Sequence, residues 1–68
     1  MAHDKLKARA NVIAINYEQR TLNGFSTKLM DAIIHADLQN RAKFGTCFPE
    51  YVLAYHLWYR QEFDTKGM

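Results

Sequence analysis

Residues 44–63 read FGTCFPEYVLAYHLWYRQEF, and this stretch decides the fold that the sequence predicts. It holds seven of the nine aromatic residues, and with them the only Trp, the only Pro and the only Cys. Pro49 suits the first turn of a helix, because its ring fixes φ and its missing N–H would have no partner there. Glu50 follows in the same turn, where a negative charge favours the helix dipole. We therefore expect a helix over residues 49–64, followed by a frayed chain end.

This predicted helix is apolar around most of its circumference. Its apolar positions cover roughly 260°, whereas an ordinary surface helix has an apolar stripe of about 100° or a little more. Such a helix must be buried on nearly all sides, which two neighbouring helices would not achieve. The excess side chains are suited to a protein interface, since Tyr, Trp and Arg dominate interface hot spots. We expect that interface to use Tyr51, Leu53, Tyr55, Leu57, Trp58, Tyr59 and Arg60.

A first helix is predicted over residues 4–23. Its apolar residues recur at helical spacing, and Asp4 and Gly24 suit the N-cap and the position after the last turn. A second apolar stripe lies on the opposite face of this helix and includes Val12 and Ile15. A small bundle would not cover both stripes, so we expect Val12 and Ile15 to contribute to the same interface.

The helix between these two is predicted over residues 26–44. Ser26 suits its N-cap and Gly45 its far end. Asp37 and Arg41 interrupt the apolar face of this helix, and their spacing of four residues would allow them to pair. Two interpretations stay open: a pair at the wet edge of the core, or a buried polar element that contacts a partner or ligand.

The length of the chain indicates one domain, residues 1–68. A chain this short buries only about 60% of the surface that its unfolded form exposes, so a single copy would be marginally stable. One Cys allows no internal disulfide, and the His and Cys residues lack a structural-zinc spacing, so we expect no metal. The sequence thus predicts an all-α three-helix bundle that oligomerisation completes, most simply as a homodimer.

Neither a membrane span nor a targeting segment is evident, and the single Cys fits a reducing compartment, so we expect a cytoplasmic protein. Phosphate loops and hydrolase signatures are also missing, so we expect no enzyme activity and no cofactor.

His56 lies in the aromatic stripe, where it either bonds a carbonyl or hydroxyl group or contacts a partner or ligand. The favoured function is a small interaction protein, such as an adaptor, regulator or inhibitor, that binds itself and another protein.

Two alternatives stay open. The second and third predicted helices are joined by a short Gly-containing turn, as in a helix-turn-helix DNA-binding regulator. That third helix carries one cation, Arg60, although groove readers need several; a basic line of Lys5, Arg9 and Arg20 on the first helix could contact phosphates instead. The other alternative is a nucleotide-like ligand stacked on the aromatic rings, in a site between protomers because one small chain has little room for a pocket.

Overall fold

Four helices make up the part of the chain that the computed structural model describes, which is the backbone of residues 2–62 and the side chains of residues 5–62. They are α1 (Ala2–Glu18), α2 (Gly24–His35), α3 (Leu38–Cys47) and α4 (Pro49–Arg60). No strand occurs within this range, which confirms the all-α expectation, while the predicted count of three helices is wrong. None of these helices has the length and apolar character needed to cross a membrane.

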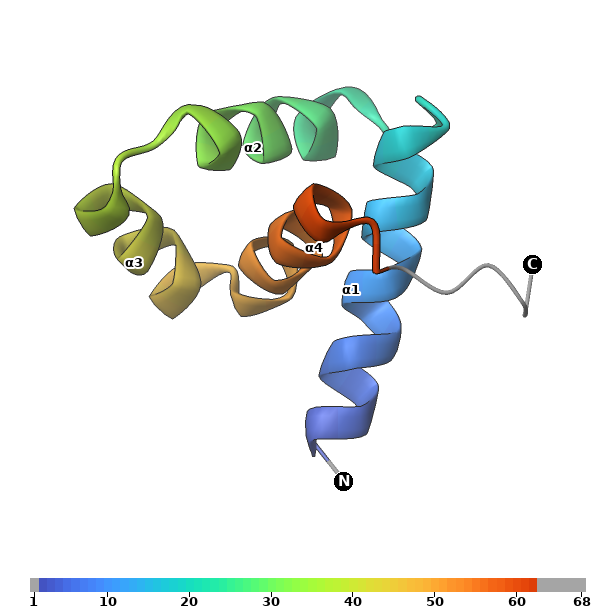
Figure 1. Cartoon of the computed structure of the whole chain (residues 1–68). Helices are drawn as coiled ribbons and strands as arrows, with labels where there is room; N and C mark the ends of the chain where they lie inside the picture. The colour runs from blue at the N-terminus through green and yellow to red at the C-terminus, as the bar shows by residue number, and fades with distance from the viewer. Residues whose placement is uncertain (1, 63–68) are drawn as a thin grey trace.

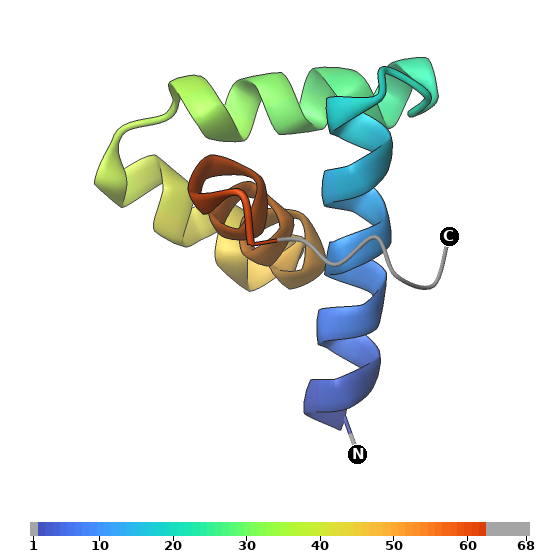
Figure 2. The ribbon, with the colours of Figure 1, turned by 45° about the vertical axis from the view of Figure 1, so that its right-hand side comes forward.

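The helix α4 lies at the centre of the arrangement and contacts each of the other three helices. Figure 1 shows α1 upright along one side, α2 across one end of α1, and α4 between α1 and the α2–α3 pair. The turned view in Figure 2 shows the same order. The expectation that α4 has only two neighbours is therefore wrong.

The helix predicted over residues 26–44 is broken at Ala36 and Asp37. Both residues are extended, with ψ of 147° and 174°. The Asp37 side chain accepts a hydrogen bond of 2.8 Å from the backbone N–H of Asn40 and so caps α3. An Asp competes with helical hydrogen bonding and is favoured at an N-cap, which explains the break at this position. The break gives α4 its third neighbour.

The helix α1 ends earlier than predicted, because Arg20 adopts the left-handed conformation with φ of 60°. The N–H of Thr21 bonds to the carbonyl of Asn16 at 2.8 Å, and that of Arg20 bonds to the carbonyl of Tyr17 at 3.1 Å. These two bonds form a Schellman motif, which normally has Gly at the left-handed position. The predicted N-cap, Asp4, lies inside α1, and its side chain is outside the described residues.

The predicted roles of two glycines and one serine are also corrected. Gly24 begins α2 instead of ending α1, and Asn23 caps α2 in place of Ser26 by accepting the Ser26 N–H at 2.8 Å. Gly45 lies inside α3, which continues to Cys47. The expected start of α4 at Pro49 is confirmed.

The end of α4 also differs from the prediction. Gln61 turns left-handed with φ of 56°, and the Glu62 N–H bonds to the carbonyl of Leu57 at 2.8 Å. The helix therefore stops at Arg60. The predicted last residues of this helix, 63 and 64, and the tail expected to fray lie outside the described residues.

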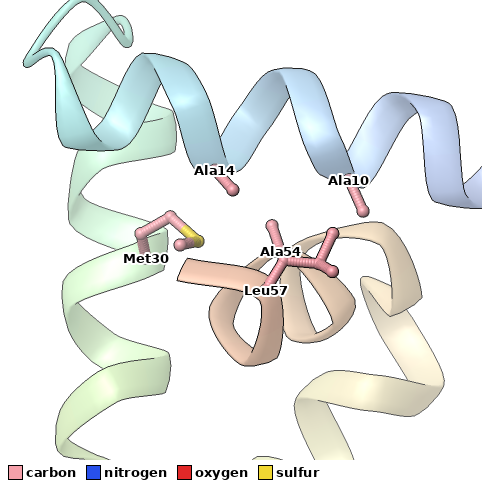
Figure 3. Close-up of a cluster of buried hydrophobic side chains, with 5 residues drawn as sticks. All are labelled: Ala10, Ala14, Met30, Ala54 and Leu57. Carbon is pink, nitrogen blue, oxygen red and sulfur yellow. The ribbon is translucent and has the colours of Figure 1, made fainter. Parts of the chain in front are cut away.

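Small side chains bring α1 and α4 close together in the core. Ala10 and Ala14 on α1 and Ala54 on α4 are all fully buried. Figure 3 shows the two alanines of α1 directed at Ala54 and Leu57, with Met30 of α2 closing the cluster. Because alanine adds little width to a helix, the two backbones approach closely, and this contact fixes where the aromatic side chains of α4 emerge.

Candidate functional site

The open side of α4 carries a row of rings that begins under a guanidinium group. The Arg41 guanidinium lies over the Tyr55 ring, 4.5 Å from its centroid. The Tyr55 ring lies 5.8 Å from the Tyr59 ring and 5.1 Å from the His56 ring. We call these four residues, Arg41, Tyr55, His56 and Tyr59, the ring ladder. Tyr59 is 70% exposed and His56 is also exposed, so the ladder ends at the protein surface.

Arg41 is held in place by the break between α2 and α3. Its Nη2 donates to the carbonyl of Ala36 at 2.7 Å, and its Nε donates to the carbonyl of Ile33 at 3.2 Å. These carbonyls lie at the end of α2, where the helix carries a partial negative charge and its last acceptors have few backbone partners; the Ile33 carbonyl also accepts the Ala36 N–H at 3.2 Å. Through these N–H bonds Arg41 fixes α2 and α3 to each other. The same guanidinium group lies over the Tyr55 ring. The predicted pair with Asp37 is replaced by these bonds and by the Asp37 cap of α3.

The nine predicted interface residues do not share one environment. Ile15 and Leu57 are buried in the protomer, with 1% and 8% of their surface exposed. The remaining seven are half-buried or exposed: Val12, Tyr51, Leu53, Tyr55, Trp58, Tyr59 and Arg60. Of these, Val12 and Tyr51 line a shallow opening of about 420 Å³ beside Arg9, on a different part of the surface from the ring ladder.

The predicted phosphate contacts are distributed over two places. Lys5 and Arg9 are exposed on α1, whereas Arg20 lies in the turn after it. The turns available for a helix-turn-helix unit are also short. Ala36 and Asp37 separate α2 from α3, and Phe48 alone separates α3 from α4, while the motif uses a turn of about three or four residues.

A second constellation joins side chains of three helices around a cleft of about 440 Å³. We call it the acidic cleft; its lining residues are Tyr17, Glu18, Arg20, Thr27, Asp31 and Trp58. The rings of Tyr17 and Trp58 meet nearly at right angles, 83° apart, with 5.2 Å between centroids. The Tyr17 hydroxyl donates to Asp31 Oδ1 and the Trp58 Nε1 donates to Glu18 Oε2, both at 2.6 Å.

The environment of Tyr17 changes its acidity. Burial raises the pKa of the Tyr17 phenol from 10.0 to about 12, and the hydrogen bond and negative charge of Asp31 act in the same direction. The phenol therefore stays protonated, and keeps donating to Asp31, into the range above pH 10 where an ordinary tyrosine ionises. The pattern of residues did not predict this cleft, because Tyr17 fits a core stripe and Asp31 fits a solvated face.

Open surface clefts of a few hundred cubic ångströms thus occur within one chain, although its length predicted little room for one; the ligand site between protomers stays a prediction. One of these clefts, of about 520 Å³, lies between α2 and α3 and is mainly apolar, with Phe44 and Phe48 in its wall. Among the side chains of residues 5–62, no three His, Cys, Asp or Glu side chains gather closely enough to hold a metal ion.

No protein family, curated protein or solved structure matches this chain. The proposed function therefore rests on the chemistry of the chain's own surfaces.

Proposed function

We propose that this chain is a non-catalytic protein-binding module that docks on another protein through the ring ladder. The observation that carries the proposal is the exposed end of the ladder at Tyr59, which α3 supports through Arg41 and Tyr55. Tyr and Arg side chains held in place before binding lose little conformational freedom on docking, which favours affinity.

The charge beside the ladder indicates the chemistry of the partner. Arg60 follows Tyr59 in α4, is exposed, and places a positive charge next to the end of the ladder. Complementary potentials guide association and exclude wrong partners. The proposed partner therefore presents an apolar ridge bordered by carboxylates, with which Tyr59 packs and Arg60 pairs.

Affinity capture with the folded chain as bait tests this proposal, provided that two variants, each lacking one exposed ring, are compared for binding to the captured protein. Tyr59→Ala is the test variant, and Phe25→Ala is the matched control because Phe25 is 67% exposed on α2. For a captured partner, Tyr59→Ala should weaken binding at least about ten-fold, as expected of a hot spot. Phe25→Ala should change it by less than about three-fold. Equal losses for the two variants would refute the ladder as the contact surface.

Self-association is tested by a separate measurement. Analytical ultracentrifugation at micromolar concentration distinguishes the 8.0 kDa monomer from a dimer. A dimer that Tyr59→Ala dissociates would show that the ladder binds a second copy instead of another protein. DNA retention that falls steeply with salt and with Lys5→Ala and Arg9→Ala would favour the regulator alternative.

A further inference from the structure

The acidic cleft is a second surface with its own chemistry. Its lining residues come from the last turn of α1, from the turn that follows it, from α2 and from α4, so groups that are distant in sequence meet there. Tyr17 and Trp58 supply two rings that are nearly perpendicular. Both rings line the cleft, and the faces of Trp and Tyr attract cations through their quadrupoles.

The charge of the acidic cleft also favours a cation. Glu18 and Asp31 each carry a negative charge, and Arg20 is the one cation among the lining residues. Each carboxylate is oriented by a ring donor through a single oxygen, Asp31 by the Tyr17 hydroxyl and Glu18 by the Trp58 indole. A carboxylate has about four acceptor sites, so both keep free acceptors after these bonds. With Arg20 included, the lining has a formal net charge of −1, which favours a cation over an anion such as a phosphate.

Aromatic rings and carboxylates together determine which kind of cation fits the acidic cleft. A metal ion prefers a shell of oxygen ligands, whereas two of the six residues that line this cleft are aromatic. An ammonium group at the end of an alkyl stem fits better: its three N–H donors match the free acceptors of Asp31 and Glu18, and its methylenes pack against the rings. The phenol oxygen of Tyr17 remains available as a further acceptor while its O–H donates a hydrogen bond to Asp31.

We propose that the acidic cleft binds a primary alkylammonium group, carried either by a free alkylamine or by a lysine side chain of another protein. This site is separate from the ring ladder and does not depend on it. Trp58 is the only Trp in the chain and lines the cleft, so its fluorescence reports occupancy directly.

The experiment is a fluorescence titration with three probes. Butylamine represents the free amine. Nα-acetyl-lysine methylamide, which keeps its ε-ammonium group, represents the protein side chain, and Nα-acetyl-norleucine methylamide is the uncharged control. Both cations should give saturable changes with millimolar dissociation constants, as expected for a small surface cleft. The lysine derivative should bind more tightly if the natural ligand is a protein, and no more tightly than butylamine if it is a free amine.

Isosteric variants test which groups bind the probe. Asp31→Asn and Glu18→Gln remove the charges while leaving an oxygen to accept from Tyr17 and Trp58, and each should weaken binding about ten-fold. Glu50→Gln is the matched control, since it removes one carboxylate two turns from Trp58 in α4, and it should leave binding unchanged. Amide NMR spectra of the variants verify the fold, and Tyr59→Ala should leave this titration unaltered.

Three results would overturn the proposal. The first is no saturable change with either cation, and the second is an equal change with the norleucine control. The third is unchanged affinity in folded Asp31→Asn and Glu18→Gln. Failure here would leave the ring ladder proposal standing, because the two sites share no residue.

Discussion

Replacing Arg41 should destabilise the fold more than its surface position suggests. Two of its hydrogen bonds have good length, at 2.7 and 3.2 Å, and a third to Ile34 at 3.5 Å is weak. Each good bond contributes about 1 kcal/mol net, and the contact with the Tyr55 ring adds about 0.5–1 kcal/mol. Arg41→Ala should therefore lower the free energy of unfolding by about 2–3 kcal/mol.

That loss is large for a chain of this length. A domain of 68 residues has a total stability of about 3–10 kcal/mol, and its melting temperature falls by about 4–8 °C for each kcal/mol lost. Urea unfolding followed by Trp58 fluorescence and circular dichroism measures the effect. Arg41→Lys should lose about half as much, because it keeps the charge at the end of α2 but loses the planar fork.

Lys43→Ala is the control, since Lys43 is an exposed cation on the same helix. If Arg41→Ala costs no more than Lys43→Ala, Arg41 does not hold α2 and α3 together. A double-mutant cycle with Tyr55→Leu isolates the ring contact, and a coupling energy below about 0.3 kcal/mol would show that this contact contributes nothing.

Three further changes test local features of the fold. The folded protein binds the Tyr17 proton more tightly than the unfolded chain does, with a pKa of about 12 against 10.0. Its stabilising contribution, about 1 kcal/mol after solvent screening, is complete below pH 10 and is lost as the pH rises towards 12. Tyr17→Phe should flatten that part of the stability–pH curve in urea unfolding, and an unaltered curve would contradict the assignment. Arg20→Gly should raise the melting temperature, because removing the left-handed Cβ strain outweighs the added chain entropy by about 0.5–1 kcal/mol. Gly45→Ala should stabilise α3 by about 0.5–1 kcal/mol, since the new methyl group meets only Val52 Cγ2 at 3.9 Å; a lower melting temperature would show a clash.

Local signals in the sequence predicted those elements whose cause is local. Pro49 and Glu50 mark the start of α4 through φ and charge alone, and α4 begins there. The break after α2 has a local cause as well, the capping preference of Asp37, but the apolar pattern continues across it. Asp37 and Arg41 on the apolar face are the visible sign of that break, but residue spacing alone does not distinguish a break from a polar interruption within one helix.

Helix ends were less predictable because glycine is a statistical marker and not a requirement. The left-handed positions belong to Arg20 and Gln61, whereas Gly24 and Gly45 are helical. A left-handed non-glycine residue costs about 1–2 kcal/mol, which tertiary packing can offset. The sequence alone does not contain that balance.

The acidic cleft lay beyond sequence reasoning for a different reason. Its two hydrogen bonds join residues 14 and 40 positions apart. Such contacts depend on the angles between helices, and here the buried alanines of α1 and α4 set how closely those helices pack. Residue spacing gives no estimate of that geometry.

The aromatic side chains of α4 can now be separated by what holds each of them. The Tyr51 hydroxyl bonds with the Ser26 hydroxyl at 2.8 Å, Trp58 donates to Glu18, and Tyr55 lies under Arg41. The helices α1, α2 and α3 therefore cover most of the apolar surface of α4, part of which two neighbouring helices would have left exposed. Tyr59 remains, 70% exposed at the end of the ladder.

We infer that a partner covers one stripe of α4 and does not complete the core, so that folding precedes binding. Cooperative unfolding of the monomer, at a midpoint that does not depend on protein concentration, would support this order; a midpoint that rises with concentration would instead make a second copy part of the fold.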